Sequence, residues 1–214
     1  MVEVHPVPER IGAIVGDVLQ NLRSTLDHLA YQLFRRGPGI TDSSPAAHVY
    51  FPISDDATKH QTGSLGKLRG MGQNAINAIN ATKPYKGGND SLWRLHKLNN
   101  IDKHRFVITV GAAFRSLDLG AHIFGHLADL APALANMEPI HAFFKPSDRM
   151  FPLNVGDELF IDAPDAKVNQ KMQFQFEVAF GEPGIVEGEP LLEALKGLAD
   201  LVDNMISDFA PLLK

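Results

Sequence analysis

The chain has 214 residues, of which 44% are hydrophobic and 21% charged, and its formal net charge is −5; this composition is typical of a globular protein with a sizeable core. The absence of cysteine excludes disulfides, thiolate metal sites and cysteine nucleophiles. The chain lacks an apolar run of the roughly 18 residues that span a bilayer, and its start, MVEVHPVPER, lacks the pattern of a signal peptide. We therefore expect a soluble, cytoplasmic protein with no membrane partner.

The charge is distributed unevenly along the chain. Residues 1–107 carry a net charge of +4 and residues 108–214 a net charge of −9. Within the first half, residues 58–107 contain nine Lys or Arg and only two acids. Such a basic segment can attract an anionic partner such as RNA or a phosphate. The alternative is a solvated basic face that pairs with the acidic second half.

The first predicted helix covers residues 8–36. Pro8 suits the first turn of a helix, and apolar residues recur at helical spacing along the segment. The sequence GPG at 37–39 ends the helix, because glycine and proline interrupt the backbone pattern there.

Two further helices are predicted before the middle of the chain. Residues 37–62 are expected to form a loop with one short strand, VYFPI. A helix over 64–82 has a clear apolar side, although its glycines weaken helix formation. The turn PYKGGND then leads into a helix over 91–107, which Asp90 or Ser91 can cap through a side-chain oxygen.

From about residue 117 the pattern becomes that of short strands. The segments SLDLGAHIF, PIHAFFKP, DELFID and KMQFQFEVAF are read as strands, and the last alternates with a period of two from Met172 to Val178. A final helix is predicted over 189–210, with leucines and other apolar residues along one side.

These elements predict an α+β fold in a single domain over residues 1–214. A helical bundle of about four helices occupies residues 8–110 and 189–210. A small antiparallel β-sheet, inserted over about 117–181, precedes the C-terminal helix.

The predicted helix 91–107 places one acid among apolar residues. At about 100° per residue, its apolar face holds Asp102, with Asn99 at the edge. A carboxylate in such a position is costly unless it is paired or hydrogen-bonded. Asp102 is therefore predicted to be buried and partnered. The opposite, polar side of the helix carries His96, Asn100, Lys103 and His104.

The first helix offers partners for that acid. A polar stripe borders its apolar face and consists of Asp17, Asn21, Ser24 and His28, whereas Arg23 and Asp27 project on another side, nearer solvent or a second subunit. If the two helices pack together, His28 or Asn21 meets Asp102 or Asn99. A carboxylate orients a histidine and raises its pKa; the alternative is a buried polar network that fixes helix register without chemistry.

Two segments resemble an uncharacterised family of bacterial proteins. They are NLRSTLDHLAYQL at 21–33 and LWRLHKLNNIDKHR at 92–105, which are similar to the paired NLRSxLDHL and LNxIDKHR stretches of that family. The likeness extends towards the β-region and the last helix. It implies a shared fold but no particular activity.

The six residues from Arg23 to His28 form an R-x4-H pattern, which resembles the R-x4-6-H motif of HEPN-type helical RNases. The resemblance implies a homodimer in stress or defence that cleaves RNA without a metal, with Arg23 holding phosphate and His28 as general acid/base. Ser24 departs from the Asn, Asp or His that often follows the arginine, and the motif lies in the first helix instead of late in the domain. The expected catalytic residues are Arg23, His28 and Asp102, and the expected binding residues are Asn21, Asp27, Asn99, Lys103, His104 and Arg105.

Two other functions remain open. The first is a non-catalytic binding or assembly protein, in which the polar residues form a structural network or a small-ligand pocket. The second is a metal-binding bundle built from Asp17, His28, Asp102 and another histidine. His122 and His126 are four apart but lack the glutamate of HExxH, and GSLGKLRGMG lacks the residues of a phosphate loop. We therefore expect no metal and no cofactor.

Overall fold

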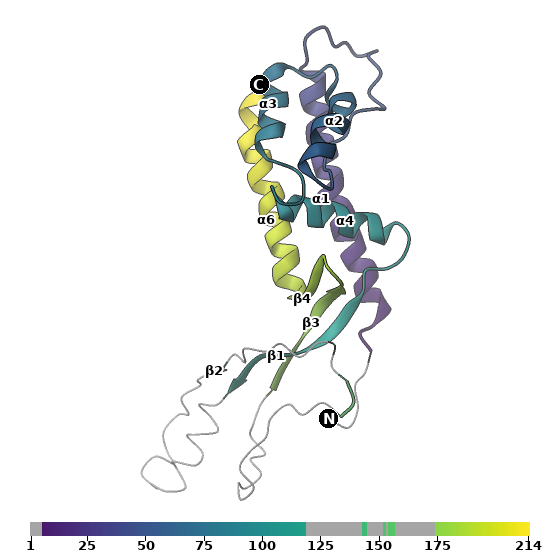
Figure 1. Ribbon diagram of the computed structural model, residues 1–214, viewed down its shortest axis with the longest axis vertical. Coiled ribbons are helices and arrows are strands. Elements are labelled where there is room, and N and C mark those ends of the chain that lie inside the picture. The colour runs from purple at the N-terminus through teal and green to yellow at the C-terminus, as the bar shows by residue number, and fades with distance from the viewer. Residues whose placement is uncertain (1–5, 119–142, 145–151, 153, 157–173) are drawn as a thin grey trace, which may run out of the picture. The chain divides into compact units, whose positions relative to one another are not determined.

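The computed structural model describes residues 6–118, 143–144, 152, 154–156 and 174–214, and these form an α+β fold (Figure 1). The strand predicted at DELFID and the pair His122 and His126 lie outside the described residues. The chain divides into two compact units, which are treated separately below. The helical unit comprises 9–107, 182–186 and 192–214, and the β unit comprises 1–8, 108–181 and 187–191. No helix in the described ranges is long and apolar enough to cross a membrane.

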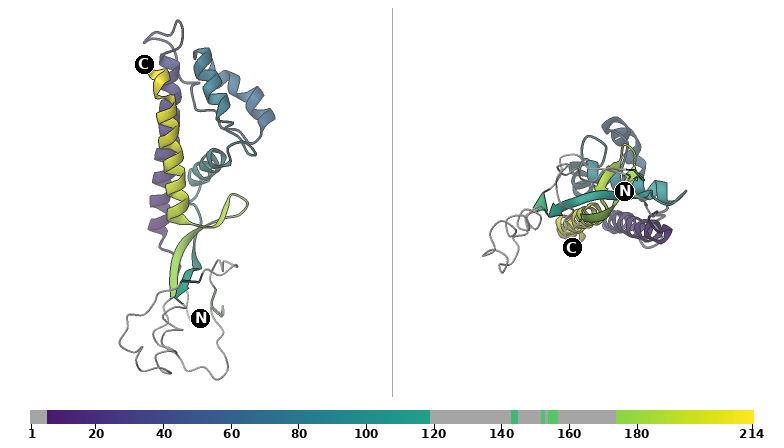
Figure 2. Two further views of the ribbon diagram at one scale, coloured as in Figure 1. Left: turned by 90° about the vertical axis from the view of Figure 1, so that its left-hand side faces the viewer. Right: turned by 90° about the horizontal axis from the view of Figure 1, so that it is seen from below.

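Two long helices run in the same direction through the helical unit (Figures 1 and 2). They are α1, Glu9–Arg35, and α6, Leu191–Phe209, which ends in a 3-10 turn, Ala210–Leu213, beside α1. Both were predicted from apolar spacing, and both predictions are confirmed within two residues at each end. The apolar stripe of α1 is buried from Val15 to Phe34.

The helix predicted over 64–82 is wrong in extent, because two helices occupy this part of the chain. They are α2, Ala57–Leu68, and α3, Gln73–Ala81. Gly70 lies between them with φ of +92°, a left-handed conformation that favours glycine and interrupts a helix. The first turn of α2 falls in the predicted loop, where the Asp56 carboxylate accepts a hydrogen bond from the Lys59 backbone N–H at 2.8 Å.

The predicted strand VYFPI is buried but is not part of the sheet. Phe51 is fully buried and Ile53 is 3% exposed, yet residues 49–53 have no strand assignment. The only ladder contact near them is an isolated parallel bridge between Ser54 and Tyr85 within the described residues. Side chains of α1 instead satisfy the backbone of this segment, as described below.

Helix α4, Asp90–Asp102, is shorter than the predicted helix 91–107. Its N-cap is Asn89, whose side chain accepts from the Leu92 N–H at 3.1 Å, so the predicted caps Asp90 and Ser91 already lie inside the helix. It packs against α1. Gly16 of α1 allows the close approach, because a Cβ at this position would overlap the Asp102 carboxylate.

The β unit contains an antiparallel sheet. Its strands are β1, Thr109–Asp118; β2, Phe143–Phe144; β3, Phe174–Glu182; and β4, Val186–Pro190, in the order β2-β1-β3-β4. Strand β1 pairs antiparallel with β3, with Thr109 opposite Phe180, and antiparallel with β2. The strand predicted at KMQFQFEVAF is confirmed as β3. The sheet starts at Thr109, before the predicted residue 117, because α4 ends early.

Candidate functional site

Arg23 is a buried cation that holds a loop to helix α1. Its side chain is 8% exposed, and Nη2 donates to the backbone oxygen of Phe51 at 2.8 Å. Asp27, one turn along α1, accepts from the Phe51 N–H at 2.9 Å, and its carboxylate lies 2.8 Å from Arg23 Nη1. Both polar groups of the Phe51 peptide are therefore bound by side chains of one helix.

This clamp corrects the prediction that Arg23 projects towards solvent. The segment 49–53 covers that side of α1 and buries the guanidinium. Burial lowers the pKa of Arg23, and the adjacent Asp27 opposes the shift. Asp27 itself stays half-buried, with 30% of its side chain exposed. The position of a distant loop does not follow from helical spacing, so the burial of Arg23 was not predictable from the pattern of α1.

Lys67 and His96 complete a group that we name the Arg23 centre, consisting of Arg23, Asp27, Lys67 and His96. Lys67 lies in the last turn of α2 and is half-buried. Burial lowers the pKa of Lys67, the charge of Arg23 lowers it further, and Asp27 opposes both. Lys67 makes no side-chain hydrogen bond or ion pair with the described part of the chain.

His96 is the histidine that lies near Arg23. Burial, followed by the charges of Arg23 and Lys67, lowers the pKa of His96 to about 4, so the ring is neutral at pH 7. The Asn100 amide donates to His96 Nε2 at 3.1 Å. A neutral imidazole carries one proton, so the proton of His96 lies on Nδ1. His96 was predicted to lie on the polar side of α4, and its place in the Arg23 centre was not predicted. Its position one turn from Leu92 and Asn99 was the only available signal.

Several buried polar atoms around the centre have no hydrogen-bond partner in the described parts of the chain. They are Arg23 Nη1, His96 Nδ1, Asn99 Oδ1 and Trp93 Nε1. The contact of Arg23 Nη1 with Asp27 is an ion pair whose N–H bonds are not aimed at the carboxylate. Asn99 is 1% exposed, which confirms that it faces inward. Buried polar atoms are rarely left unsatisfied, so this cluster indicates a place for further polar atoms.

His28 does not join Arg23 within the chain. It is exposed, with no hydrogen bond among the described interactions. Five residues along a helix turn the side chain by about 140° from Arg23, and Arg23 faces the buried loop. Asn21 is also exposed. The structure therefore separates the two members of the R-x4-H pattern in one protomer.

Asp102 is buried less completely than predicted. It is half-buried against Gly16, and no hydrogen bond to it exists among the described residues, so the predicted partner is wrong. Burial, followed by the charge of Asp17, raises the pKa of Asp102. His28 is not among the groups that act on this carboxylate.

The end of the NNIDKHR segment is exposed. Lys103 and His104 project to solvent, whereas Arg105 makes a bidentate pair with Glu182, with both N–O distances at 2.8 Å. Glu182 is 1% exposed. A hollow of about 370 Å³ beside α4 is lined by Lys97, Asn100, Ile101, His104 and Arg105. Lys97 also pairs with Asp55 at 2.5 Å, so both fixed cations of this hollow already have anionic partners.

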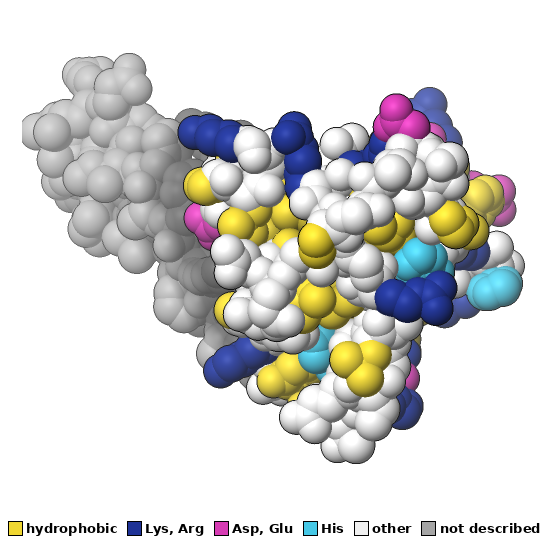
Figure 3. Space-filling model, turned by 90° about the horizontal axis from the view of Figure 1, so that it is seen from above, with side chains coloured by type: hydrophobic (Ala, Val, Ile, Leu, Met, Phe, Trp, Pro, Cys, Tyr) yellow, Lys and Arg dark blue, Asp and Glu magenta, His cyan; other side chains and the backbone are white. Residues whose placement is uncertain are grey.

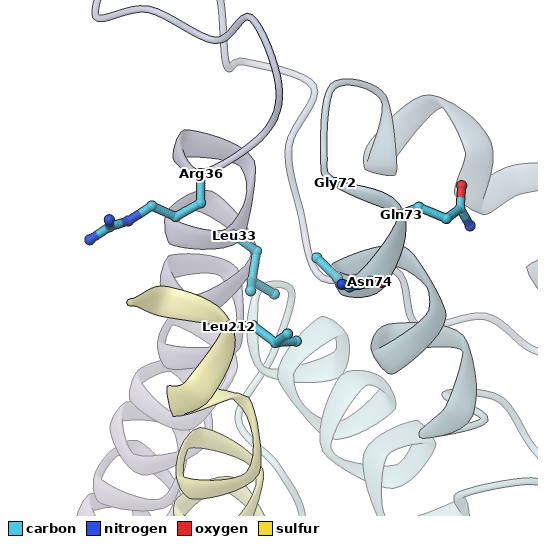
Figure 4. Close-up of a pocket in the computed structure, with 7 residues that line it drawn as sticks. Leu33, Arg36, Gly72, Gln73, Asn74 and Leu212 are labelled. Carbon is cyan, nitrogen blue, oxygen red and sulfur yellow. The ribbon is translucent and has the colours of Figure 1, made fainter.

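A second cavity, of about 340 Å³, lies between the end of α1, the start of α3 and the 3-10 turn (Figure 4). Arg36 is one of its lining residues, with its guanidinium turned away from the others in Figure 4, and Gly72 offers no side-chain cap to α3. On the face viewed in Figure 3, Lys and Arg side chains are spread around the rim and do not gather into one patch. Among the described residues, no three His, Asp or Glu side chains lie close enough to hold a metal.

Comparisons with known protein families, with characterised proteins and with solved structures find no match for the chain. The resemblances to the bacterial family and to HEPN-type RNases therefore stay predictions. The assignment of a function depends on the Arg23 centre itself.

Proposed function

We propose that the protein binds a phosphate-bearing ligand at the Arg23 centre. The observation that carries the proposal is the position of two cations, the buried Arg23 and the half-buried Lys67, beside a single carboxylate, Asp27. With His96 neutral, the centre has a net charge of +1. Buried charge is costly without compensation, and an anion would supply the missing negative charge.

The donors of the centre suit a phosphate. The guanidinium of Arg23 is held in place by Asp27 and Phe51, so its N–H groups are fixed in position before a ligand arrives. Lys67 adds a mobile ammonium, and His96 adds the Nδ1 proton. Charge-assisted hydrogen bonds from such groups to phosphate oxygens are short and strong. RNA is the phosphate-bearing partner that the R-x4-H pattern implies.

Phosphate binding can be tested without disturbing the clamp. Lys67→Met removes the unpaired ammonium, and Lys59→Met, on the exposed side of the same helix, is the matched control. Titration calorimetry with orthophosphate and with a short single-stranded RNA is expected to show at least a tenfold loss of affinity for Lys67→Met, since a hydrogen bond to a charged group contributes about 1.5–3 kcal/mol. Equal affinity in both variants, or no binding by the natural chain, contradicts the proposal.

Metal-independent RNA cleavage is a second candidate, and His96 is the observation in its favour. Its neutral imidazole lies where the charges of Arg23 and Lys67 act on it. His96 Nε2, which accepts from Asn100 in the free chain, would take a proton from a ribose hydroxyl in place of that amide while the cations hold the phosphate. This arrangement uses one chain. The HEPN-like arrangement instead needs a homodimer that brings the His28 of a second copy to Arg23.

Cleavage assays distinguish the two arrangements. If RNA is cleaved in the presence of EDTA, His96→Ala is expected to abolish the reaction and His28→Ala to preserve it. The opposite pattern favours the homodimer and removes His96 from the reaction. An absence of cleavage with intact RNA binding leaves a non-catalytic binding protein.

A further inference from the structure

Helix α4 carries a stripe of three side chains, two buried and one half-buried, that each present a buried polar atom without a partner in the described chain. They are Trp93, His96 and Asn99, spaced three residues apart. Side chains at this spacing are neighbours on a helix, with about 5–6 Å between Cβ atoms. Trp93 and Asn99 are 7% and 1% exposed. Trp93 and Asn99 are therefore the neighbours, on the surface of α4, of the one residue that this helix contributes to the Arg23 centre, His96.

The unpartnered polar atoms at this site include more hydrogen-bond donors than acceptors. Trp93 Nε1 can only donate a hydrogen bond, and His96 Nδ1 donates because Nε2 already accepts from Asn100. Arg23 Nη1 is also a donor. The Asn99 Oδ1 atom is the acceptor of this set, and a fully ionised phosphate has no proton to give it. A ligand that satisfies all four atoms must therefore carry a donor besides its phosphate.

We propose that the ligand is a small phosphomonoester with a hydroxyl or amino group about one helical turn from the phosphate, which donates to Asn99 Oδ1. This inference rests on the proposed phosphate binding and names the ligand class for the same site. The phosphate accepts from Arg23, Lys67, His96 and Trp93 Nε1. A sugar phosphate and the phosphorylated end of an RNA share this chemistry.

Trp93 provides the readout, because it is the single tryptophan of the chain and lies one turn from His96. Its fluorescence is followed during titration with ribose 5-phosphate and with methyl phosphate, which has the same phosphomonoester but no hydroxyl. Ribose 5-phosphate is expected to bind about tenfold more tightly, which corresponds to one additional hydrogen bond.

Asn99→Leu tests the acceptor. Removal of a buried polar atom that has no partner is expected to leave stability intact, and chemical unfolding of the variant checks this. The variant should bind ribose 5-phosphate and methyl phosphate with equal affinity, at the level of methyl phosphate in the natural chain. Asn74→Leu, at an exposed position on α3, is the control and should keep the tenfold preference.

Each outcome bears on a different part of the argument. Equal binding of the two phosphates by the natural chain, or an undiminished preference in Asn99→Leu, overturns the ligand class and leaves water as the occupant of the stripe. Binding of neither compound overturns the phosphate site as well. A 5′-phosphorylated tetranucleotide and its dephosphorylated form identify the source of the phosphomonoester. Tight binding of the phosphorylated tetranucleotide but not of its dephosphorylated form indicates an RNA end. Binding of ribose 5-phosphate but of neither tetranucleotide indicates a free sugar phosphate.

Discussion

Helix α4 and the segment that follows it place their polar residues in opposite surroundings. Within the helix, His96 and Asn99 present buried polar atoms that lack partners in the described chain. Three residues beyond the end of the helix at Asp102, Arg105 is half-exposed and is held by two hydrogen bonds to Glu182. The cations of NNIDKHR, residues 99–105, are thus exposed or half-exposed, and the bidentate pair of Arg105 with Glu182 stabilises the fold. A polar group indicates function more reliably when it is buried and unsatisfied than when it is charged and exposed.

The largest effect is expected from the clamp that Arg23 and Asp27 form with the backbone of Phe51. Asp27→Ala leaves Arg23 buried without its carboxylate and the Phe51 N–H without an acceptor. We expect the free energy of unfolding to fall by about 3 kcal/mol, as when a buried ion pair loses one partner. Urea denaturation measures the change. Asp42→Ala, at an exposed ion pair with Arg35, is the control. A similar loss of stability in both variants would show that the clamp contributes no more than an exposed ion pair.

A smaller loss is expected in the segment that follows helix α4. Arg105→Ala removes the cation that faces the buried Glu182 carboxylate. Because Arg105 is 49% exposed, the expected loss of about 2 kcal/mol lies below the range for fully buried pairs. Phosphate affinity should be unchanged. A loss of affinity with full stability would move the binding site to the hollow beside α4.

The pH dependence of stability provides a third test. The pKa of His96 is lowered to about 4 in the folded chain, whereas the unfolded value is about 6.5. Between these values the unfolded chain binds a proton that the folded chain does not, so stability falls as the pH is lowered from about 6.5 to 4. Allowing for solvent screening of a half-buried ring, His96 accounts for about 1–2 kcal/mol. His96→Gln should flatten this part of a stability profile, and an unchanged slope would contradict the assigned burial.

The smallest effects are expected at the exposed histidines. His28→Gln and His104→Gln remove side chains that project to solvent, and changes at such positions usually alter stability by less than about 0.5 kcal/mol. Neither should alter phosphate affinity. A large loss of affinity in His28→Gln, together with dimer formation in sedimentation experiments, would restore the R-x4-H arrangement across two chains.

The periodic segments of the fold could be predicted from the sequence. Helices α1 and α6 and strand β3 have apolar residues at the spacing of their element over most of their length, and in α1 and α6 the buried residues follow this spacing. The break at Gly70 was missed because the apolar pattern continues across it while the backbone does not. The early end of α4 was missed for the same reason.

The candidate site was harder to predict because its residues are buried by distant segments. Arg23 is polar by type and lies beside other polar residues, and only the fold of residues 49–53 over α1 shows that it is enclosed. Lys67 and His96 come from two other helices. The inward position of Asn99 did follow from helical projection, because its environment is set by α4 itself.

The contact of Gly16 with Asp102 has a consequence for how this chain can vary in evolution. A methyl group at position 16 would overlap the carboxylate, so the two positions cannot change independently while α4 keeps its place on α1. Homologous chains with alanine at position 16 should have a smaller residue in place of Asp102, and those that keep Asp102 should keep glycine. Asp102 is therefore expected to covary with a residue that has no side chain.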